Sequence, residues 1–179
     1  ETPDIPLIAA NLNRLVNASQ KQIWAVLRRG DSLQRLSYSL AATFLGRMCL
    51  SGDVAELEPA AWQFVRDALA CYREAAPVIR DGTFRCIRAG GDSYQHPTGS
   101  QIVTIHAPSQ GKLLVVWHRF AGGSAPLNIE LHAGASWRLA HDWGAPPSGA
   151  ALSGRTLHWG ARYEWTGGVL VLHAFAGPT

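Results

Sequence analysis

Hydrophobic positions in the first 80 residues alternate between helical and strand-like patterns. Two apolar runs, QIWAVL at residues 22–27 and FLGRMCL at residues 44–50, are typical of strands covered on both faces. Segments with helical spacing precede, separate and follow these runs, and two of them have start signals. Asp31 or Ser32 can cap the second segment, and Pro59 occupies the first turn of the third. The order helix, strand, helix, strand, helix predicts a parallel sheet with right-handed crossovers.

The apolar faces of the three helical segments can also be predicted from spacing. The first helix is expected within residues 6–16, and the second has a leucine stripe at Leu33, Leu36 and Leu40. The third is expected to bury one face made of Trp62, Val65, Leu69 and Tyr72.

Helical spacing disappears after residue 81. Runs rich in Val, Ile, Thr and Trp follow at about ten-residue spacing and are separated by Gly, Pro and Ser. The seven runs are TFRCIR, SQIVTIHA, KLLVVWHRF, PLNIELH, SWRLAHDW, TLHWG and GGVLVLHAF. They predict an antiparallel β-sandwich or barrel. We therefore expect an α/β part at residues 1–81 and an all-β domain at residues 82–179.

The predicted parallel sheet has only two strands, which cannot bury both faces or satisfy both edges. Residues 1–81 are therefore expected to be the last βα units of a larger α/β unit such as a (β/α)8 barrel. In such barrels, active sites are built at the carboxyl ends of the strands. Ser51, Gly52 and Asp53 follow the second predicted strand and would lie at that end.

Composition and charge exclude several classes of function. The formal net charge is +3 and charged residues make up 16% of the chain, without a basic cluster, so nucleic acid is not an expected partner. No apolar stretch is long enough to span a membrane, and the first residues do not resemble a signal peptide. Three cysteines without a C-x-x-C pair indicate buried thiols in a reducing compartment, so a cytoplasmic location is expected. A first residue other than Met suggests a piece of a longer chain.

The order of these elements resembles the end of the catalytic domain in glycoside hydrolase family 36, the α-galactosidase and melibiase group. The resemblance runs from QIWAVLRRGDSLQRLSYSLAATFLGRMCLSGDVAEL to CYREAAPVIRDGTF. In that family, a long helix after the eighth barrel strand carries a Tyr-Lys pair before a G-x-F/Y sequence leads into a C-terminal β-domain. Tyr72-Arg73 and Gly82-Thr83-Phe84 correspond to these two features, with Arg in place of Lys.

The resemblance implies a retaining glycosidase as the parent protein. Retention requires two carboxyl groups about 5–5.5 Å apart across the scissile bond. In the family these follow the fourth and sixth barrel strands, which would precede the present chain or fall at its start. No catalytic residue is therefore assigned, and the chain by itself is not expected to be catalytic. Expected partners are an α-galactoside in the parent enzyme and the rest of the barrel. Assembly into a homo-oligomer is a further possibility.

Five residues are candidates for weak substrate contacts, each with a structural alternative. Asp53 could accept hydrogen bonds from sugar hydroxyls or cap the following turn. Trp24 could be a platform for a sugar ring or a core residue of its strand. Arg28 could contact substrate or lie in a solvated loop. Ser51 and Gly52 complete the set as the small residues at the strand end.

Two rival functions rest on the second half of the chain. Histidines on several predicted strands suggest a metal site as one possibility. They do not recur at a common spacing along the strands, however, so neither a metal nor a cofactor is expected. They are His106, His118, His132, His141, His158 and His173. Tryptophans could instead form an exposed strip, which would make residues 82–179 a non-catalytic carbohydrate-binding β-sandwich. They are Trp117, Trp137, Trp143, Trp159 and Trp165, and their alternative place is the core.

Overall fold

A computed structural model describes residues 3–91, 93–131, 135–160 and 163–175. The first half contains two parallel strands and three α-helices. In chain order these are α1 (Ile5–Leu12), β1 (Gln22–Leu27), α2 (Leu33–Thr43), β2 (Arg47–Gly52) and α3 (Pro59–Asp81), with short 3-10 turns η1 (Ala18–Gln20) and η2 (Val54–Glu56). The predicted order of elements and the parallel pairing are confirmed.

The second half is antiparallel throughout its named strands. A five-stranded sheet has the order β3-β4-β5-β10-β7, and a three-stranded sheet has the order β6-β9-β8. The strands are β3 (Thr83–Ala89), β4 (Ser100–Ala107), β5 (Lys112–Arg119), β6 (Leu127–Glu130), β7 (Ser136–Gly144), β8 (Ala151–Ser153), β9 (Thr156–Trp159) and β10 (Thr166–Phe175). All seven predicted strands are present, and the short β8 is an addition that the sequence pattern did not reveal. Its three residues are too few to show alternation.

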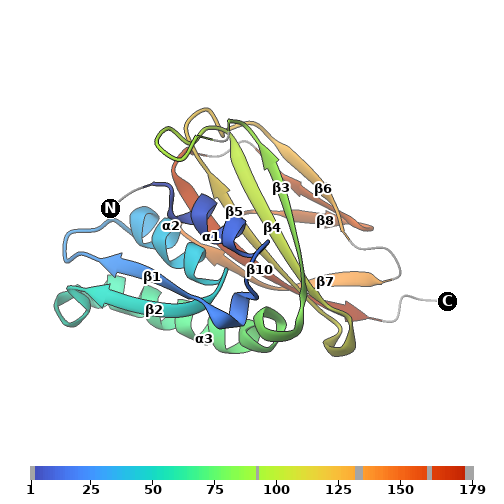
Figure 1. Cartoon of the computed structure of the whole chain (residues 1–179), viewed down its shortest axis with the longest axis horizontal. Coiled ribbons are helices and arrows are strands. Elements are labelled where there is room, and N and C mark those ends of the chain that lie inside the picture. Colours follow the sequence, from blue (N-terminus) through green and yellow to red (C-terminus); the bar gives the residue numbers. More distant parts are fainter. Residues whose placement is uncertain (1–2, 92, 132–134, 161–162, 176–179) are drawn as a thin grey trace.

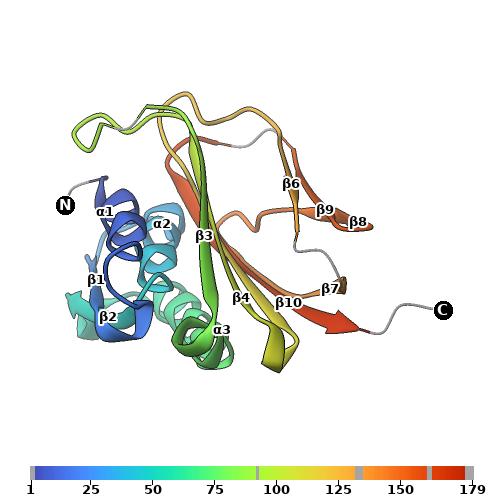
Figure 2. The same cartoon turned by 45° about the vertical axis from the view of Figure 1, so that its right-hand side comes forward.

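The elements stack in layers (Figures 1 and 2). The β1–β2 sheet lies outermost, the helices lie behind it, the five-stranded sheet follows, and the three-stranded sheet lies on the far side. One core fills the space between the helices and both neighbouring sheets, and a second core lies between the two antiparallel sheets. Strands β4, β5 and β10 contribute alternate residues to each core, which explains why they are nearly continuous apolar runs.

One expectation about β1 is wrong. We predicted a strand covered on both faces, but burial along β1 alternates. Ile23, Ala25 and Leu27 face the helices and are buried, whereas Trp24 on the opposite face is 55% exposed. Because more than half of its surface is exposed, Trp24 is not a core residue. A continuous apolar run cannot by itself show which of its faces the rest of the molecule covers.

All three helices differ in part from their predicted extent or buried face. In α2, Leu36 and Leu40 are buried as predicted, but Leu33 is exposed. α1 ends at Leu12, and Leu15 beyond it is 82% exposed. α3 does begin at Pro59, but Trp62 is exposed, because the buried face is centred on smaller residues. These are Ala61, Val65, Ala68, Cys71, Ala75, Val78 and Ile79. The side chain of Trp62 lies outside this buried face.

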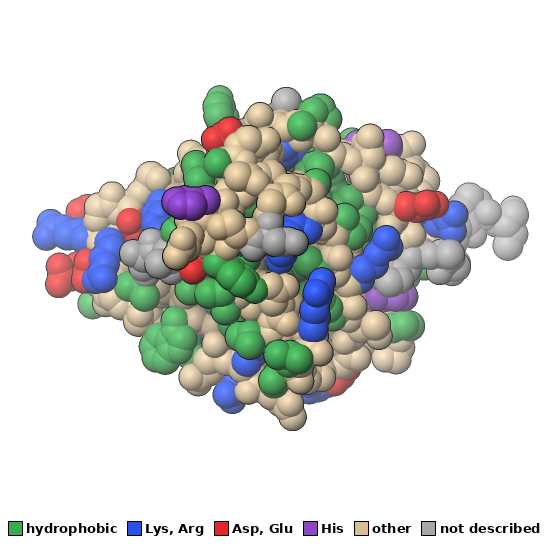
Figure 3. Space-filling view, turned by 45° about the horizontal axis from the view of Figure 1, so that its top comes forward, with side chains coloured by type: hydrophobic (Ala, Val, Ile, Leu, Met, Phe, Trp, Pro, Cys, Tyr) green, Lys and Arg blue, Asp and Glu red, His purple; other side chains and the backbone are tan. Residues whose placement is uncertain are grey.

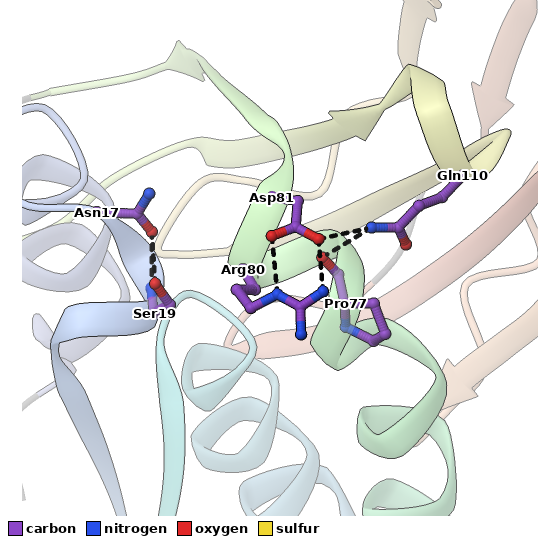
Figure 4. Close-up of polar contacts among 6 residues, drawn as sticks. All are labelled: Asn17, Ser19, Pro77, Arg80, Asp81 and Gln110. Carbon is purple, nitrogen blue, oxygen red and sulfur yellow. Dashed lines mark hydrogen bonds and ion pairs between the residues drawn. The ribbon is translucent and has the colours of Figure 1, made fainter.

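Polar contacts join the helical half to the antiparallel half. In Figure 4, Gln110 of the β4–β5 connection donates Nε2 to the carbonyl oxygen of Pro77 at 3.2 Å and to Oδ2 of Asp81 at 3.0 Å. Asp81 also accepts from Arg80, and Asn17 accepts from Ser19 across the neighbouring surface. The carboxyl end of α3 is therefore fixed to the five-stranded sheet. Within the described ranges, the helices are too short or too polar to cross a membrane.

Candidate functional site

The first candidate site is the carboxyl edge of the β1–β2 sheet, where Leu27 is in register with Gly52. Gly52 has φ +86°, a conformation that strongly favours glycine, and a Cβ there would lie 2.2 Å from the carbonyl oxygen of Leu27. The backbone N–H of Asp53 donates to the same carbonyl oxygen at 2.8 Å. Glycine therefore allows the chain to turn tightly over the end of β1 and places Asp53 beside the loop that follows β1.

The structure brings Arg28 and Asp53 together at this edge. Nη1 of Arg28 lies 3.8 Å from Oδ1 of Asp53, and the backbone N–H of Arg29 donates to Oδ2 of Asp53 at 3.3 Å. Asp53 stands at the amino end of η2 but makes no side-chain capping bond, so its carboxylate is directed to the β1 loop. The pair is exposed, which makes it worth less than about 1 kcal/mol for stability. An exposed carboxylate beside a guanidinium can bind vicinal hydroxyl groups through both partners.

Trp24 and Ser51 lie on the outer face of the same sheet. Trp24 is in register with Cys49, and Ser51 is two residues further along β2, opposite Val26. Trp24 also borders a cavity of about 20 Å³ whose walls include Arg35 and Tyr38 of α2. This cavity has room for little more than one water molecule. A ligand on Trp24 would therefore lie on the open sheet face.

A larger groove lies beyond Arg35 and Tyr38. Two cavities of about 400 and 310 Å³ share Pro3 and Trp165 in their walls. The first also includes Ser32, Gln34, Arg35 and Tyr38, and the second includes Gln95, His96, Pro97, Thr98 and Ala121. Of these residues the sequence pattern indicated only Trp165, because the others come from four separate segments of the chain. The available signal was a tryptophan directly before the predicted strand GGVLVLHAF.

Ser32 caps the amino end of α2, the helix that forms part of the groove wall. Its hydroxyl oxygen accepts from the backbone N–H of Arg35 at 3.2 Å, which confirms the predicted cap of α2. The cap fixes the first turn of α2 and with it the positions of Gln34 and Arg35 in the groove wall.

The tryptophans and histidines of the second half bear on the two rival functions. Four tryptophans are buried, so they form no exposed aromatic strip. They are Trp117, Trp137, Trp143 and Trp159. No group of three potential metal ligands occurs among the described residues, and His132 of the predicted set lies outside them.

Several histidines have structural partners instead. Burial lowers the pKa of His118 to about 4, although a hydrogen bond between its Nε2 and the carbonyl oxygen of Tyr38 opposes the shift. His141 and His173 each place Nε2 2.6 Å from a carboxylate oxygen of Glu74 on α3. These histidines link the antiparallel sheet to α2 and α3.

Comparisons with known proteins point to one fold. No protein-family model matches the chain, and no curated protein matches it by sequence. Among solved structures, the galactosidase domain of the α-galactosidase-sucrose kinase AgaSK matches 98% of this chain with 25% of its own, at a TM-score of 0.72 and 12% identity.

Other solved α-galactosidases give the same result. A family 36 enzyme, AgaA from Geobacillus stearothermophilus, was solved as a variant in complex with 1-deoxygalactonojirimycin. It matches 86% of this chain with 21% of its own, at a TM-score of 0.63 and 14% identity. The α-galactosidase from Lactobacillus brevis matches 87% with 22%, at a TM-score of 0.60 and 11% identity.

The chain thus spans about a quarter of the length of the first of these chains and about a fifth of the others. Identities of 11–14% support a shared fold only. The match confirms the resemblance found in the sequence: this chain is structurally similar to one portion of glycoside hydrolase family 36 α-galactosidases.

Proposed function

We propose that this chain is the C-terminal part of an α-galactosidase-like retaining glycoside hydrolase. In this proposal, residues 1–81 supply the last βα units of a (β/α)8 barrel, and residues 82–179 form a β-sandwich domain that supports them. The rest of the barrel is then the principal partner, and the catalytic carboxylates belong to it. The proposed substrate is an α-galactoside, in line with the AgaA variants solved with a galactose-type inhibitor and with raffinose.

The observation that carries the proposal is the half-covered β1–β2 sheet. Its inner face packs on helices, while its outer face presents Trp24 to solvent. A two-stranded parallel sheet with crossover helices on one side has the geometry of a barrel segment, in which the other side faces the barrel interior. The antiparallel half holds the helices from behind through the first core, so it can support a barrel without contributing catalytic groups.

In the same proposal the strand-end residues form the rim of the sugar site. Asp53 and Arg28 would bind sugar hydroxyls, Ser51 would face the site from β2, and Gly52 would shape the turn. Trp24 would form part of the barrel wall. A hydrogen bond from a sugar hydroxyl to the charged Asp53 would contribute about 1.5–3 kcal/mol to substrate affinity. Bond cleavage would depend on the catalytic carboxylates in the rest of the barrel.

The test is release of nitrophenol from an aryl α-galactoside by the intact polypeptide that contains this sequence. Asp53→Asn is assayed beside it, with Asp67→Asn on the exposed face of α3 as the matched control. Hydrolysis by the intact protein and a fall of about ten-fold or more in kcat/KM for Asp53→Asn alone are expected. Asparagine keeps an oxygen for the Arg29 N–H, so folding should be retained. Absence of hydrolysis would overturn the proposed activity, and equal kcat/KM in both variants would overturn the rim assignment.

A further inference from the structure

The backbone at Trp165 is strained. Trp165 has φ +55° and is the only non-glycine residue with positive φ among those the structure describes. A bulky residue in this region costs of the order of 1 kcal/mol, and such strain persists only where the surroundings impose it. The indole is nevertheless 38% exposed, directly before β10. Core packing alone therefore does not account for a tryptophan at this position.

Contacts from two segments, α2 and residues 120–122 after β5, hold the loop of Trp165 in place. Gln34 of α2 donates Nε2 to the carbonyl oxygens of Glu164 at 3.1 Å and Trp165 at 3.4 Å. The backbone N–H of Gly122 donates to Oε1 of Glu164 at 2.8 Å. The indole also packs against the rings of Tyr38 and Phe120, with centroids 6.3 and 6.4 Å away. The ring is thus fixed before any ligand arrives, which lowers the entropy cost of binding.

Trp165 lines both cavities of the groove. Its two cavities, about 400 and 310 Å³, meet at Trp165 and Pro3 and fall within the range of roughly 300–1,000 Å³ that is usual for small-molecule sites. On the face of the molecule that Figure 3 shows, hydrophobic side chains are interspersed with basic, histidine and other side chains. A ligand lying across the indole would occupy both cavities at once.

The chemistry of the walls selects the class of ligand. Gln34, Arg35 and Ser32 line one of the two cavities that share Trp165, and Gln95, His96 and Thr98 line the other. These amide, hydroxyl, guanidinium and imidazole groups can bond to hydroxyls, while no carboxylate lines either cavity among the described residues. An apolar peptide would cover these polar side chains with apolar groups, which is unfavourable. A nucleic acid strand would need a run of cations that the groove does not have.

We propose that this groove binds a neutral oligosaccharide, with the C–H face of a sugar ring on the indole of Trp165 and one further unit in each direction. The inference does not depend on the proposed activity, because it requires no barrel and no bond cleavage.

Footprinting of the intact protein with hydroxyl radicals tests the proposal at the residue itself. Trp165 and Trp62 are 38% and 40% exposed, so Trp62 of α3 is a matched internal control. With raffinose as the probe, oxidation of Trp165 measured by mass spectrometry is expected to fall at least three-fold relative to Trp62. Radical scavenging by the sugar affects both residues equally and cancels in the ratio. An unchanged ratio up to tens of millimolar raffinose overturns the proposal, whether or not the protein hydrolyses α-galactosides.

Calorimetry on variants provides the second measurement. Trp165→Gly removes the ring and suits the positive φ, so the backbone is expected to keep its conformation. Raffinose should then bind about ten-fold more weakly, whereas Trp165→Tyr should restore most of the affinity and Trp62→Ala should leave it unchanged. Equal weakening by Trp165→Gly and Trp62→Ala contradicts a specific groove. Competition by an apolar peptide but not by sugar would assign the groove to protein docking instead.

Discussion

At the scale of single residues, the conformation of a few backbone positions decides how the candidate sites are built. Gly52 allows the close contact between the end of β2 and the carbonyl of Leu27, and Trp165 adopts a glycine-like φ with a large side chain. At Gly52 there is no space for a side chain. At Trp165 a large side chain is present although the positive φ makes the backbone strained. Both lie where a strand meets a loop that borders a proposed site.

The Gly52→Ala variant tests the strand-end geometry. Its Cβ would lie 2.2 Å from a backbone oxygen at φ +86°, so β1 and β2 must shift apart. We expect a loss of about 3 kcal/mol in the free energy of unfolding and a fall of roughly 10 °C in Tm. Gly30→Ala is the matched control, because a Cβ at Gly30 meets nothing within 4 Å. A Tm of Gly52→Ala equal to that of the control would show that the turn is not tight.

At the scale of elements, Glu74 ties α3 to the five-stranded sheet. Its carboxylate accepts from His141 of β7 and His173 of β10 at 2.6 Å, and Nζ of Lys112 of β5 lies 3.4 Å away. Burial alone would raise the pKa of Glu74, but the hydrogen bonds from His173 and His141 and the nearby positive charges outweigh it and lower the pKa. The contacts therefore stabilise the folded state when Glu74 is ionised.

Glu74→Gln is expected to reduce the free energy of unfolding at pH 7 by about 1 kcal/mol, after allowance for solvent screening. A carboxyl group with a lowered pKa stabilises the fold above its unfolded value of 4.5, and this contribution is lost as the pH falls through the lower folded value. The difference between wild type and variant, measured by urea unfolding, should thus shrink below pH 4.5.

Two features make the pH dependence of the stability difference between wild type and Glu74→Gln specific to Glu74. The buried neutral His118 removes stability between pH 6.5 and about 4 in wild type and variant alike, so its effect cancels. Glu56→Gln, at an exposed position of η2, is the control and should behave as wild type. A difference at Glu74 that stays constant down to pH 3 would mean that its charge does not hold α3 to the sheet.

At the scale of the whole molecule, the layers are covered unequally. The five-stranded sheet is packed on both faces, whereas the outer face of the β1–β2 sheet carries the exposed Trp24. In the proposed enzyme this face closes the barrel. Exposed apolar surface next to unpaired strand edges promotes association, so the same face would drive self-association when the partner segments are removed.

The 179-residue chain expressed alone is therefore expected to bind a hydrophobic dye more strongly than the intact protein does. Trp24→Ser should lower this dye fluorescence, and Trp62→Ser, which removes an exposed tryptophan from α3, should lower it less. The measurement is dye fluorescence combined with light scattering. A monomer that melts cooperatively and binds no dye would contradict the barrel interpretation.

The sequence by itself determined the order and type of most elements. Periodicity located the helices and the seven longer strands, and Ser32 and Pro59 marked helix starts that the structure confirms. The end of the second strand was also indicated by Ser51, Gly52 and Asp53, although Ser51 and Gly52 lie within β2 and only Asp53 follows it. These features depend on neighbours within four residues, which the local pattern contains; whether these residues bind sugar remains a prediction.

Only the tertiary structure decided which faces are covered. The outward turn of Trp24 and Trp62, the direction of the Asp53 carboxylate and the groove at Trp165 all depend on contacts between distant segments. Gln34, for example, bonds to the carbonyl oxygen of Glu164, 130 residues away. An apolar pattern states that a side chain can be buried, but the packing of remote elements determines whether it is, since burial requires a partner that the local sequence does not contain.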